Sequence, residues 1–149
     1  MVEIYVDADA CPVKEEVVRV ADRYDLTVHM VSNAHMRLPQ GKSVNQVIVS
    51  DGFDAADDWI ADNIKPKDIA ITADVPLAAR CVENQAFVIG PTGKDFSNAS
   101  IGMDLAMRNL NAHLRETGEI KGGGAPFSKK DRSNFLSVLD RMVNKAKRS

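Results

Sequence analysis

Short apolar segments alternate with helical segments along the first two thirds of this chain, and this alternation constrains the fold more than any other feature. The predicted strands are Glu3–Asp7, Leu26–Ser32, Val44–Ser50, Asp68–Thr72 and Ala86–Ile89. Helices are predicted over residues 13–24, 54–64 and 76–84, where proline or aspartate stands at or near the first turn. Strand–helix alternation predicts an α/β domain with a mainly parallel sheet of about five strands. The connection from the second to the third strand lacks a helix, so the direction of the third strand stays open.

Composition places the chain among ordinary globular domains. It has 149 residues, of which 44% are hydrophobic and 27% charged. No apolar run approaches the roughly 20 residues of a membrane span, and the first residues, MVEIYVD, lack the basic start of a signal peptide. The two cysteines have no metal-type spacing. We therefore expect a cytoplasmic protein without a membrane partner.

The last third of the chain has a different pattern. A helix is predicted over Ile101–Glu116, followed by the glycine-rich segment Lys121–Pro126 and a final helix. Ser128 and Asp131 have the spacing of a capping box. An apolar stripe follows, formed by Phe135, Leu136, Leu139 and Met142. We predict an α/β domain at 1–120 and a glycine-hinged basic helix at 121–149, packed on that domain or extending from it.

Charge is distributed unevenly along the chain. Residues 121–149 hold eight Lys/Arg against two Asp, whereas residues 1–120 hold eleven Lys/Arg against nineteen Asp/Glu. An acidic body with a basic tail suits a metal site beside an arm that binds a polyanion. The alternative is a solvated helix face with a charged terminus.

Five aspartates stand where predicted strands end and helices begin. They are Asp7, Asp9, Asp54, Asp57 and Asp74. In an open α/β sheet, the carboxyl ends of the strands share one edge, and ligands bind there. Two carboxylates about 4 Å apart repel by about 4 kcal/mol at an effective dielectric constant near 20, so such a cluster needs a cation, bound protons or helix N-termini. Oxygen ligands favour Mg²⁺ or Mn²⁺.

Each of these acids also has a structural interpretation. Asp7 or Asp9 suits the cap of the helix behind Pro12, and Asp54, Asp57 and Asp58 suit the first turn of the next helix. Asp74 suits an N-cap as well, while the Thr72 hydroxyl is placed to position a water or a phosphate oxygen. A doubly wound strand order would put Asp7 and Asp74 on adjacent strands. Cys11 is expected to be a buried small hydrophobe rather than a nucleophile.

The motifs DADACPVK, GFDAADDWI, ITADVPLA and APFSKKDRSNFLSVLD closely resemble the YaiI/YqxD family of small bacterial proteins, which is similar to the PIN-like nuclease superfamily. The resemblance covers nearly the whole chain. It implies a three-layer PIN-like α/β fold with an acidic site for Mg²⁺ or Mn²⁺ that cleaves RNA or DNA phosphodiesters. Asp7, Asp57 and Asp74 match acids of that site, and Asp9 or Asp95 is the candidate for a fourth.

The implied mechanism is metal-assisted hydrolysis of a phosphodiester, with nucleic acid, RNA first, as the partner. Basic residues would offset the phosphate charge. The candidates are Arg37, Lys42, Lys94, Lys129, Lys130 and Arg132. Two rival hypotheses are a non-catalytic module that binds nucleic acid or protein, and a haloacid dehalogenase-type phosphatase that would use Asp7 and Asp9. The oligomeric state, a homodimer included, stays open.

Overall fold

A computed structural model describes residues 2–8, 11–35, 37–49, 55–96 and 128–148. Its strands are β1 (Glu3–Asp7), β2 (Thr27–Ser32), β3 (Val44–Ile48), β4 (Ile69–Ile71), β5 (Phe87–Ile89) and β6 (Asp95–Phe96). Its helices are α1 (Lys14–Tyr24), α2 (Ala55–Asn63), α3 (Val75–Glu83) and α5 (Lys129–Arg148). The helix expected at 101–116, the hinge at 121–126 and the 120/121 boundary lie outside the described residues.

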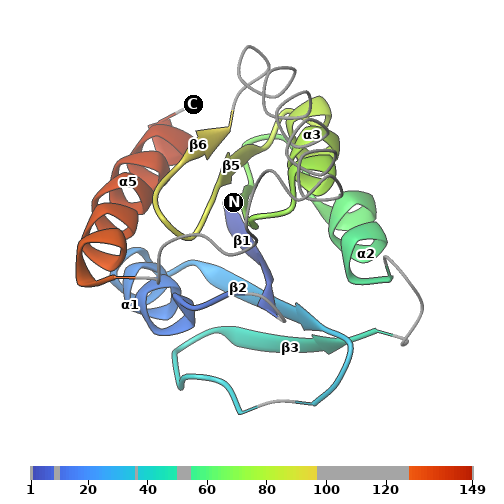
Figure 1. Ribbon diagram of the computed structural model, residues 1–149, viewed down its shortest axis with the longest axis horizontal. Coiled ribbons are helices and arrows are strands. Elements are labelled where there is room, and N and C mark those ends of the chain that lie inside the picture. Colours follow the sequence, from blue (N-terminus) through green and yellow to red (C-terminus); the bar gives the residue numbers. More distant parts are fainter. Residues whose placement is uncertain (1, 9–10, 36, 50–54, 97–127, 149) are drawn as a thin grey trace, which may run out of the picture.

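The strands form one sheet in the order β3-β2-β1-β4-β5-β6 (Figure 1). All neighbouring pairs are parallel except β5 and β6. The predicted α/β class with a mainly parallel sheet is therefore confirmed, and the open question about the third strand is answered, since β3 runs parallel to β2. Among the described residues the sheet has six strands, where about five were expected.

The additional strand, β6, follows a tight turn. Gly90 N–H donates to the Lys94 carbonyl, and Gly93 occupies a positive φ of 93° that suits glycine. This turn reverses the chain so that Val88 pairs with Phe96. Two residues cannot show the alternation of a strand, so β6 escaped the prediction.

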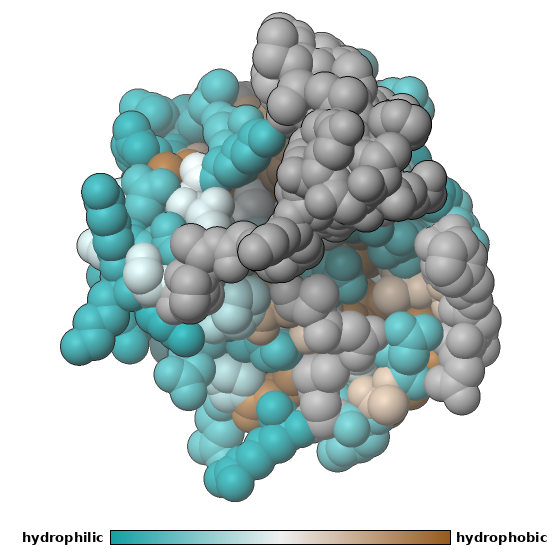
Figure 2. All heavy atoms as spheres, in the orientation of Figure 1, coloured by the Kyte–Doolittle hydropathy of each residue, from teal (hydrophilic) through white to brown (hydrophobic). Residues whose placement is uncertain are grey.

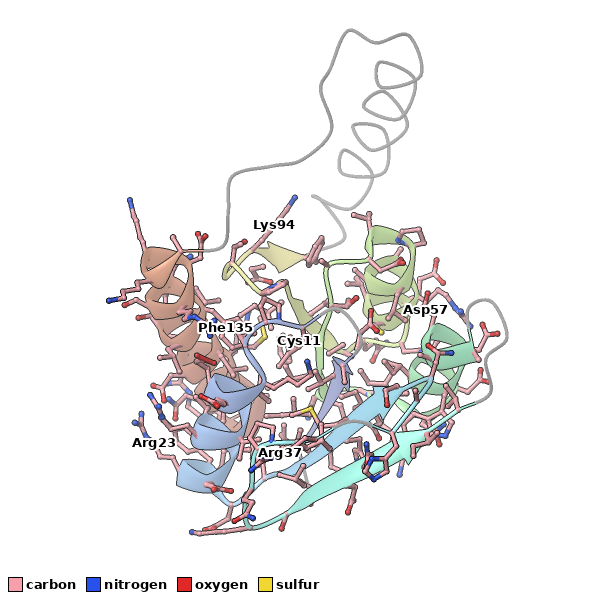
Figure 3. The ribbon with its side chains drawn as sticks, turned by 60° about the horizontal axis from the view of Figure 1, so that its bottom comes forward. Cys11, Arg23, Arg37, Asp57, Lys94 and Phe135 are labelled. Atoms are coloured by element: carbon pink, nitrogen blue, oxygen red, sulfur yellow. The ribbon has the colours of Figure 1, made fainter. Side chains whose placement is uncertain are left out.

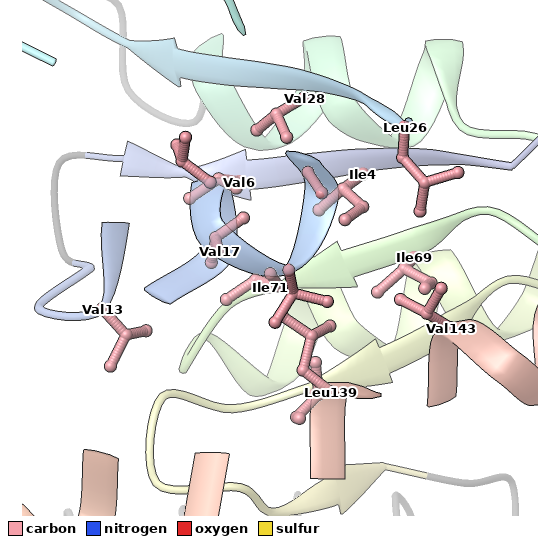
Figure 4. Close-up of a cluster of buried hydrophobic side chains, with 14 of the residues drawn as sticks. Ile4, Val6, Val13, Val17, Leu26, Val28, Ile69, Ile71, Leu139 and Val143 are labelled. Atoms are coloured by element: carbon pink, nitrogen blue, oxygen red, sulfur yellow. The ribbon is translucent and has the colours of Figure 1, made fainter. Parts of the chain in front are cut away.

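Helices cover both faces of the sheet in three layers (Figure 1). Side chains alternate along β1, so Ile4 and Val6 pack in the core beneath α1 and α5, while Tyr5 packs against α2 and α3. Ile69 and Ile71 of β4 likewise pack in the hydrophobic cluster that contains the buried residues of α1 and α5 (Figure 4). Two hydrophobic clusters therefore hold the sheet between its helices, and the first strand contributes to both.

Helix α5 belongs to this core. Its buried stripe repeats every three or four residues and comprises Phe135, Leu139, Met142, Val143 and Ala146. The predicted capping box is confirmed: Ser128 N–H donates to Asp131 Oδ2 at 3.0 Å, and Asp131 N–H donates to Ser128 Oγ at 3.2 Å. At its other end, α5 lies near the residues that precede β4, since Ala146 and Lys147 line one pocket with Lys67 and Asp68. The helix thus runs from the carboxyl edge of the sheet to the opposite edge.

Candidate functional site

The first and fourth strands lie side by side at the centre of the sheet, as the doubly wound order predicted. Ile4 is paired with Ile69 and Val6 with Ile71, so Asp7 and Thr72 come next on their strands. Strand order reverses between β1 and β4, because the chain proceeds outward to β2 and β3 on one side and to β5 on the other. Such a reversal point is where open α/β sheets bind ligands at the carboxyl ends of their strands.

The Thr72 hydroxyl joins two of the predicted acids. Its Oγ1 donates to Asp7 Oδ2 at 3.2 Å and accepts from the Asp74 backbone N–H at 3.0 Å. Thr72 is buried, with 3% of its surface exposed, whereas Asp7 and Asp74 are each half-buried. The rigid end of β4 therefore orients one carboxylate and fixes the backbone that carries the other.

Asp74 has the structural role that was its alternative interpretation. It is the N-cap of α3, and its Oδ1 accepts from Leu77 N–H at 3.0 Å. Pro76 stands in the first turn, where a missing N–H costs nothing. One oxygen of Asp74 thus stabilises the helix start.

The acids of α2 face the neighbouring helix α3. Asp58 is exposed and pairs with Arg80, with 2.8 Å between Oδ1 and the guanidinium nitrogen. Asp57 is half-buried on the same helix (Figure 3), and its charge raises the pKa of Arg80 and of Cys81 as a minor contribution beside larger causes. Asp54 lies outside the described residues.

The described part of the chain does not assemble a complete protein cage for a metal. No three Asp, Glu, His or Cys side chains among the described residues are close enough together to hold one ion. Asp9 and Asp54, two of the five predicted ligands, lie outside those residues, and Asp95 is exposed on β6. The structure thus brings Asp7, Thr72 and Asp74 together and leaves Asp57 on the α2–α3 side.

Cys11 is a buried free thiol, as expected. Burial raises the pKa of its thiol and is the largest cause; a backbone hydrogen bond from Val13 and the charge of Lys14 lower the pKa by less, and the charges of Asp7 and Glu16 raise it by the smallest amounts. A thiol held in its protonated form is a poor nucleophile.

The predicted basic residues separate into several places on the surface. Arg37 and Arg132 line one pocket, at the start of α1 and α5. Lys42 instead bonds to Asp22 and Asp25 near the end of α1. Lys94 lies over the Phe96 ring and points away from the body of the molecule (Figure 3). Lys129 and Lys130 are exposed in the first turn of α5.

Lys14 was missed by the sequence analysis, although it lines the same pocket as Arg37 and Arg132. The sequence signal that could have found Lys14 is its position: a cation in the first turn of a helix is disfavoured by the partial positive charge of that helix end.

Hydrophilic residues dominate the described surface on the face shown in Figure 2. No helix in the described ranges is long and apolar enough to cross a membrane.

Fold and site together define a doubly wound three-layer α/β protein with carboxylates at the reversal point of its sheet. The chain belongs to the YaiI/YqxD family, whose model, described as "Uncharacterized BCR, YaiI/YqxD family", matches residues 5–145. It is 58% identical over 146 residues to the UPF0178 protein Atu1478 of Agrobacterium fabrum, covering 98% of this chain and 95% of that protein. It is 57% identical over 145 residues to the UPF0178 protein R01393 of Rhizobium meliloti, covering 97% and 99%. No solved structure matches the chain significantly.

Proposed function

We propose that this protein is a Mg²⁺- or Mn²⁺-dependent nuclease that hydrolyses phosphodiester bonds of RNA, or of DNA, in the cytoplasm. The observation that supports this function best is the junction of Asp7 and Asp74 at the Thr72 hydroxyl, at the point where strand order reverses. Two sequence segments meet there, the end of β1 and the end of β4, although Asp7 and Thr72 lie 65 positions apart in the chain. The similarity of the family to PIN-like nucleases supports the same reaction class.

The residues present fit a hard divalent cation. The candidate donors are all carboxylate oxygens, which Mg²⁺ and Mn²⁺ prefer. Mg²⁺ commonly keeps several waters and uses only one or two protein carboxylates together with substrate phosphates, so a site without three protein ligands suits it. Asp7 and Asp74 would hold the ion. The other candidate ligands are Asp57 on α2 and Asp9 and Asp54, which lie outside the described residues.

The ion would supply Lewis acidity toward a phosphate oxygen and lower the pKa of a bound water. The chain's own residues hold the site in shape. The Thr72 hydroxyl donates to the Asp7 carboxylate and Leu77 N–H donates to the Asp74 carboxylate, so both groups are held in place before substrate arrives. Basic side chains at the same edge would position the strand through its phosphates.

A second candidate is a non-catalytic module that binds nucleic acid through its backbone. It is favoured by the Asp74 cap and by the hydrogen bond from Thr72 to Asp7, because these bonds give both acids a structural role without a metal. Under this function the cations would bind the strand while the acids only shape the fold.

Calorimetric titration with Mn²⁺ separates the two functions. We expect micromolar-range binding by the wild type and its loss in Asp7→Asn and Asp74→Asn. Asparagine caps a helix about as well as aspartate, so Asp74→Asn removes the charge while keeping the helix start. Asp58→Asn is the matched control, since Asp58 is exposed and paired with Arg80, and it should bind Mn²⁺ normally.

Cleavage of a labelled RNA then tests turnover. The nuclease function requires Mn²⁺-dependent cleavage by the wild type and by Asp58→Asn, but not by Asp7→Asn. Absence of Mn²⁺ binding by the wild type would refute the nuclease and leave the non-catalytic module.

A further inference from the structure

A pocket of about 720 Å³ opens between the start of α1, the loop after β2 and the first turn of α5. Cations from three separate segments line it, namely Lys14, Arg37 and Arg132, and Glu15 is the acidic side chain among the described lining residues. Leu38 and Pro39 give one wall an apolar character. Figure 3 shows Arg37 on the loop and Cys11 close to the start of α1.

The fold holds two of these cations in place. Arg132 donates to Glu16 Oε1 at 2.8 Å and to the Pro12 carbonyl at 3.0 Å, which ties α5 to α1. Lys14 Nζ donates to the Cys11 carbonyl at 2.9 Å. These bonds fix the charged groups at the rim before any ligand arrives, which lowers the entropy lost on binding.

Arg37 differs, because it makes no such hydrogen bond to another described residue. It is exposed, and its guanidinium makes no ion pair within the described part of the chain. An arginine with five free donors suits two hydrogen bonds to neighbouring oxygens of one phosphate. It lines the same pocket as Lys14 and Arg132, so the three cations can contact one bound group together.

The charge of the pocket matches a single phosphodiester. Glu16 is buried, with 10% of its side chain exposed, and pairs with Arg132, while Glu15 is a second carboxylate at the pocket. Three cations against these two carboxylates leave one net positive charge among the described residues. A phosphodiester carries one negative charge, whereas a phosphate monoester carries about 1.5 to 2 at pH 7.

The pocket lies beside the candidate nuclease site. Cys11 and Pro12 line it, and they follow closely in the chain on Asp7, the last residue of β1. Helix α1 begins there, and its N-cap residue Val13 makes no side-chain cap, so the first N–H groups of the helix add partial positive charge. A strand whose scissile phosphate lay at Asp7 would therefore have a neighbouring phosphate within reach of this pocket.

We propose that the pocket binds one backbone phosphodiester of a single-stranded nucleic acid, next to the phosphate at the aspartate edge. This inference rests on the proposed function, whose substrate strand it positions. Lys14, Arg37 and Arg132 contact the phosphate, and Leu38 and Pro39 pack against the adjoining sugar.

Fluorescence anisotropy with a labelled single-stranded RNA of roughly 12 nucleotides tests this, in EDTA and about 50 mM salt. One lost phosphate contact lowers the slope of log affinity against log salt by about 0.7, which corresponds to about eightfold weaker binding at this salt concentration. We expect that loss for Arg37→Ala and for Lys14→Ala. Glu15→Gln should strengthen binding, because it removes a negative charge from the lining.

Arg148→Ala is the matched control. Like Arg37→Ala, it removes the charge of an exposed arginine. Arg148 lies on α5 about 24 Å beyond the pocket residue Arg132, at 1.5 Å per residue, toward the opposite edge of the sheet. We expect less than a twofold change. Equal losses for Arg37→Ala and Arg148→Ala, or no binding by the wild type, would overturn the proposal.

Competition identifies the source of the phosphate. An unlabelled strand should displace the labelled RNA far better than adenosine monophosphate or inorganic phosphate does. Displacement by inorganic phosphate at similar concentration would overturn the assignment to a strand. Because EDTA removes the metal, this binding test is independent of the nuclease test. Binding with the expected pattern among the variants, but without Mn²⁺-dependent cleavage, would refute the nuclease alone. Cleavage by the wild type, with unchanged RNA binding in Arg37→Ala, would refute the phosphate pocket alone.

Discussion

Replacing Thr72 with valine should destabilise the protein by about 2 to 3 kcal/mol, because valine keeps the shape of threonine but lacks its hydroxyl. The hydrogen bond to the Asp7 carboxylate accounts for about 1.5 to 3 kcal/mol and the bond from the Asp74 N–H for about 0.5 to 1.5 kcal/mol. Asp7 is half-buried, so water replaces part of the first bond. The melting temperature should fall by about 5 to 10 °C.

Thr72→Ser is the control that isolates the hydroxyl. Serine keeps both hydrogen bonds and loses one methyl group, at a cost of about 1 kcal/mol. Urea denaturation followed by circular dichroism measures both variants, with an unchanged m-value as the sign that only stability has moved. A serine variant as unstable as the valine variant, or a valine variant within about 0.5 kcal/mol of wild type, would refute the role given to this hydroxyl.

Two further predictions concern the core and the thiols. Leu139→Ala should lower the free energy of unfolding by about 3 to 5 kcal/mol, because Leu139 is fully buried between α5 and the sheet. The control Ser137→Ala, at an exposed position of the same helix, should change it by less than about 0.5 kcal/mol. A small effect of Leu139→Ala in urea denaturation would mean that α5 is not part of the core. Burial raises the pKa of Cys81 to about 12 and also raises the pKa of Cys11. Both thiols should therefore stay protonated near pH 8 and react slowly with iodoacetamide until the protein is unfolded. Fast labelling of the folded protein would contradict this burial.

Local chemistry was readable from the sequence at several places. The Ser128–Asp131 capping box predicted the start of α5, and the spacing of Phe135, Leu139 and Met142 predicted its buried face. Both signals act within one or two helical turns, so they do not depend on the rest of the fold. The adjacency of Asp7 and Asp74 was also predictable, but only through the doubly wound strand order that the alternation of elements implied.

Other features depended on contacts between distant segments. Arg132 lies beside Pro12 and Glu16 because α5 packs on α1, and no local pattern marks that pairing across more than 110 residues. The pocket that includes Lys14 and Arg37 exists only once these segments have come together.

The sequence by itself determined the alternation of strands and helices, the faces that each buries, and the aspartates at the strand ends. The tertiary structure decided which of those side chains meet: Asp7 and Asp74 at Thr72, Asp57 toward α3, and three cations around one pocket. Periodicity and capping follow from backbone geometry over a few residues and are written in the order of the amino acids. Contacts between side chains from distant segments depend on how whole helices and strands pack together. That packing buries two hydrophobic clusters, one on each face of the sheet.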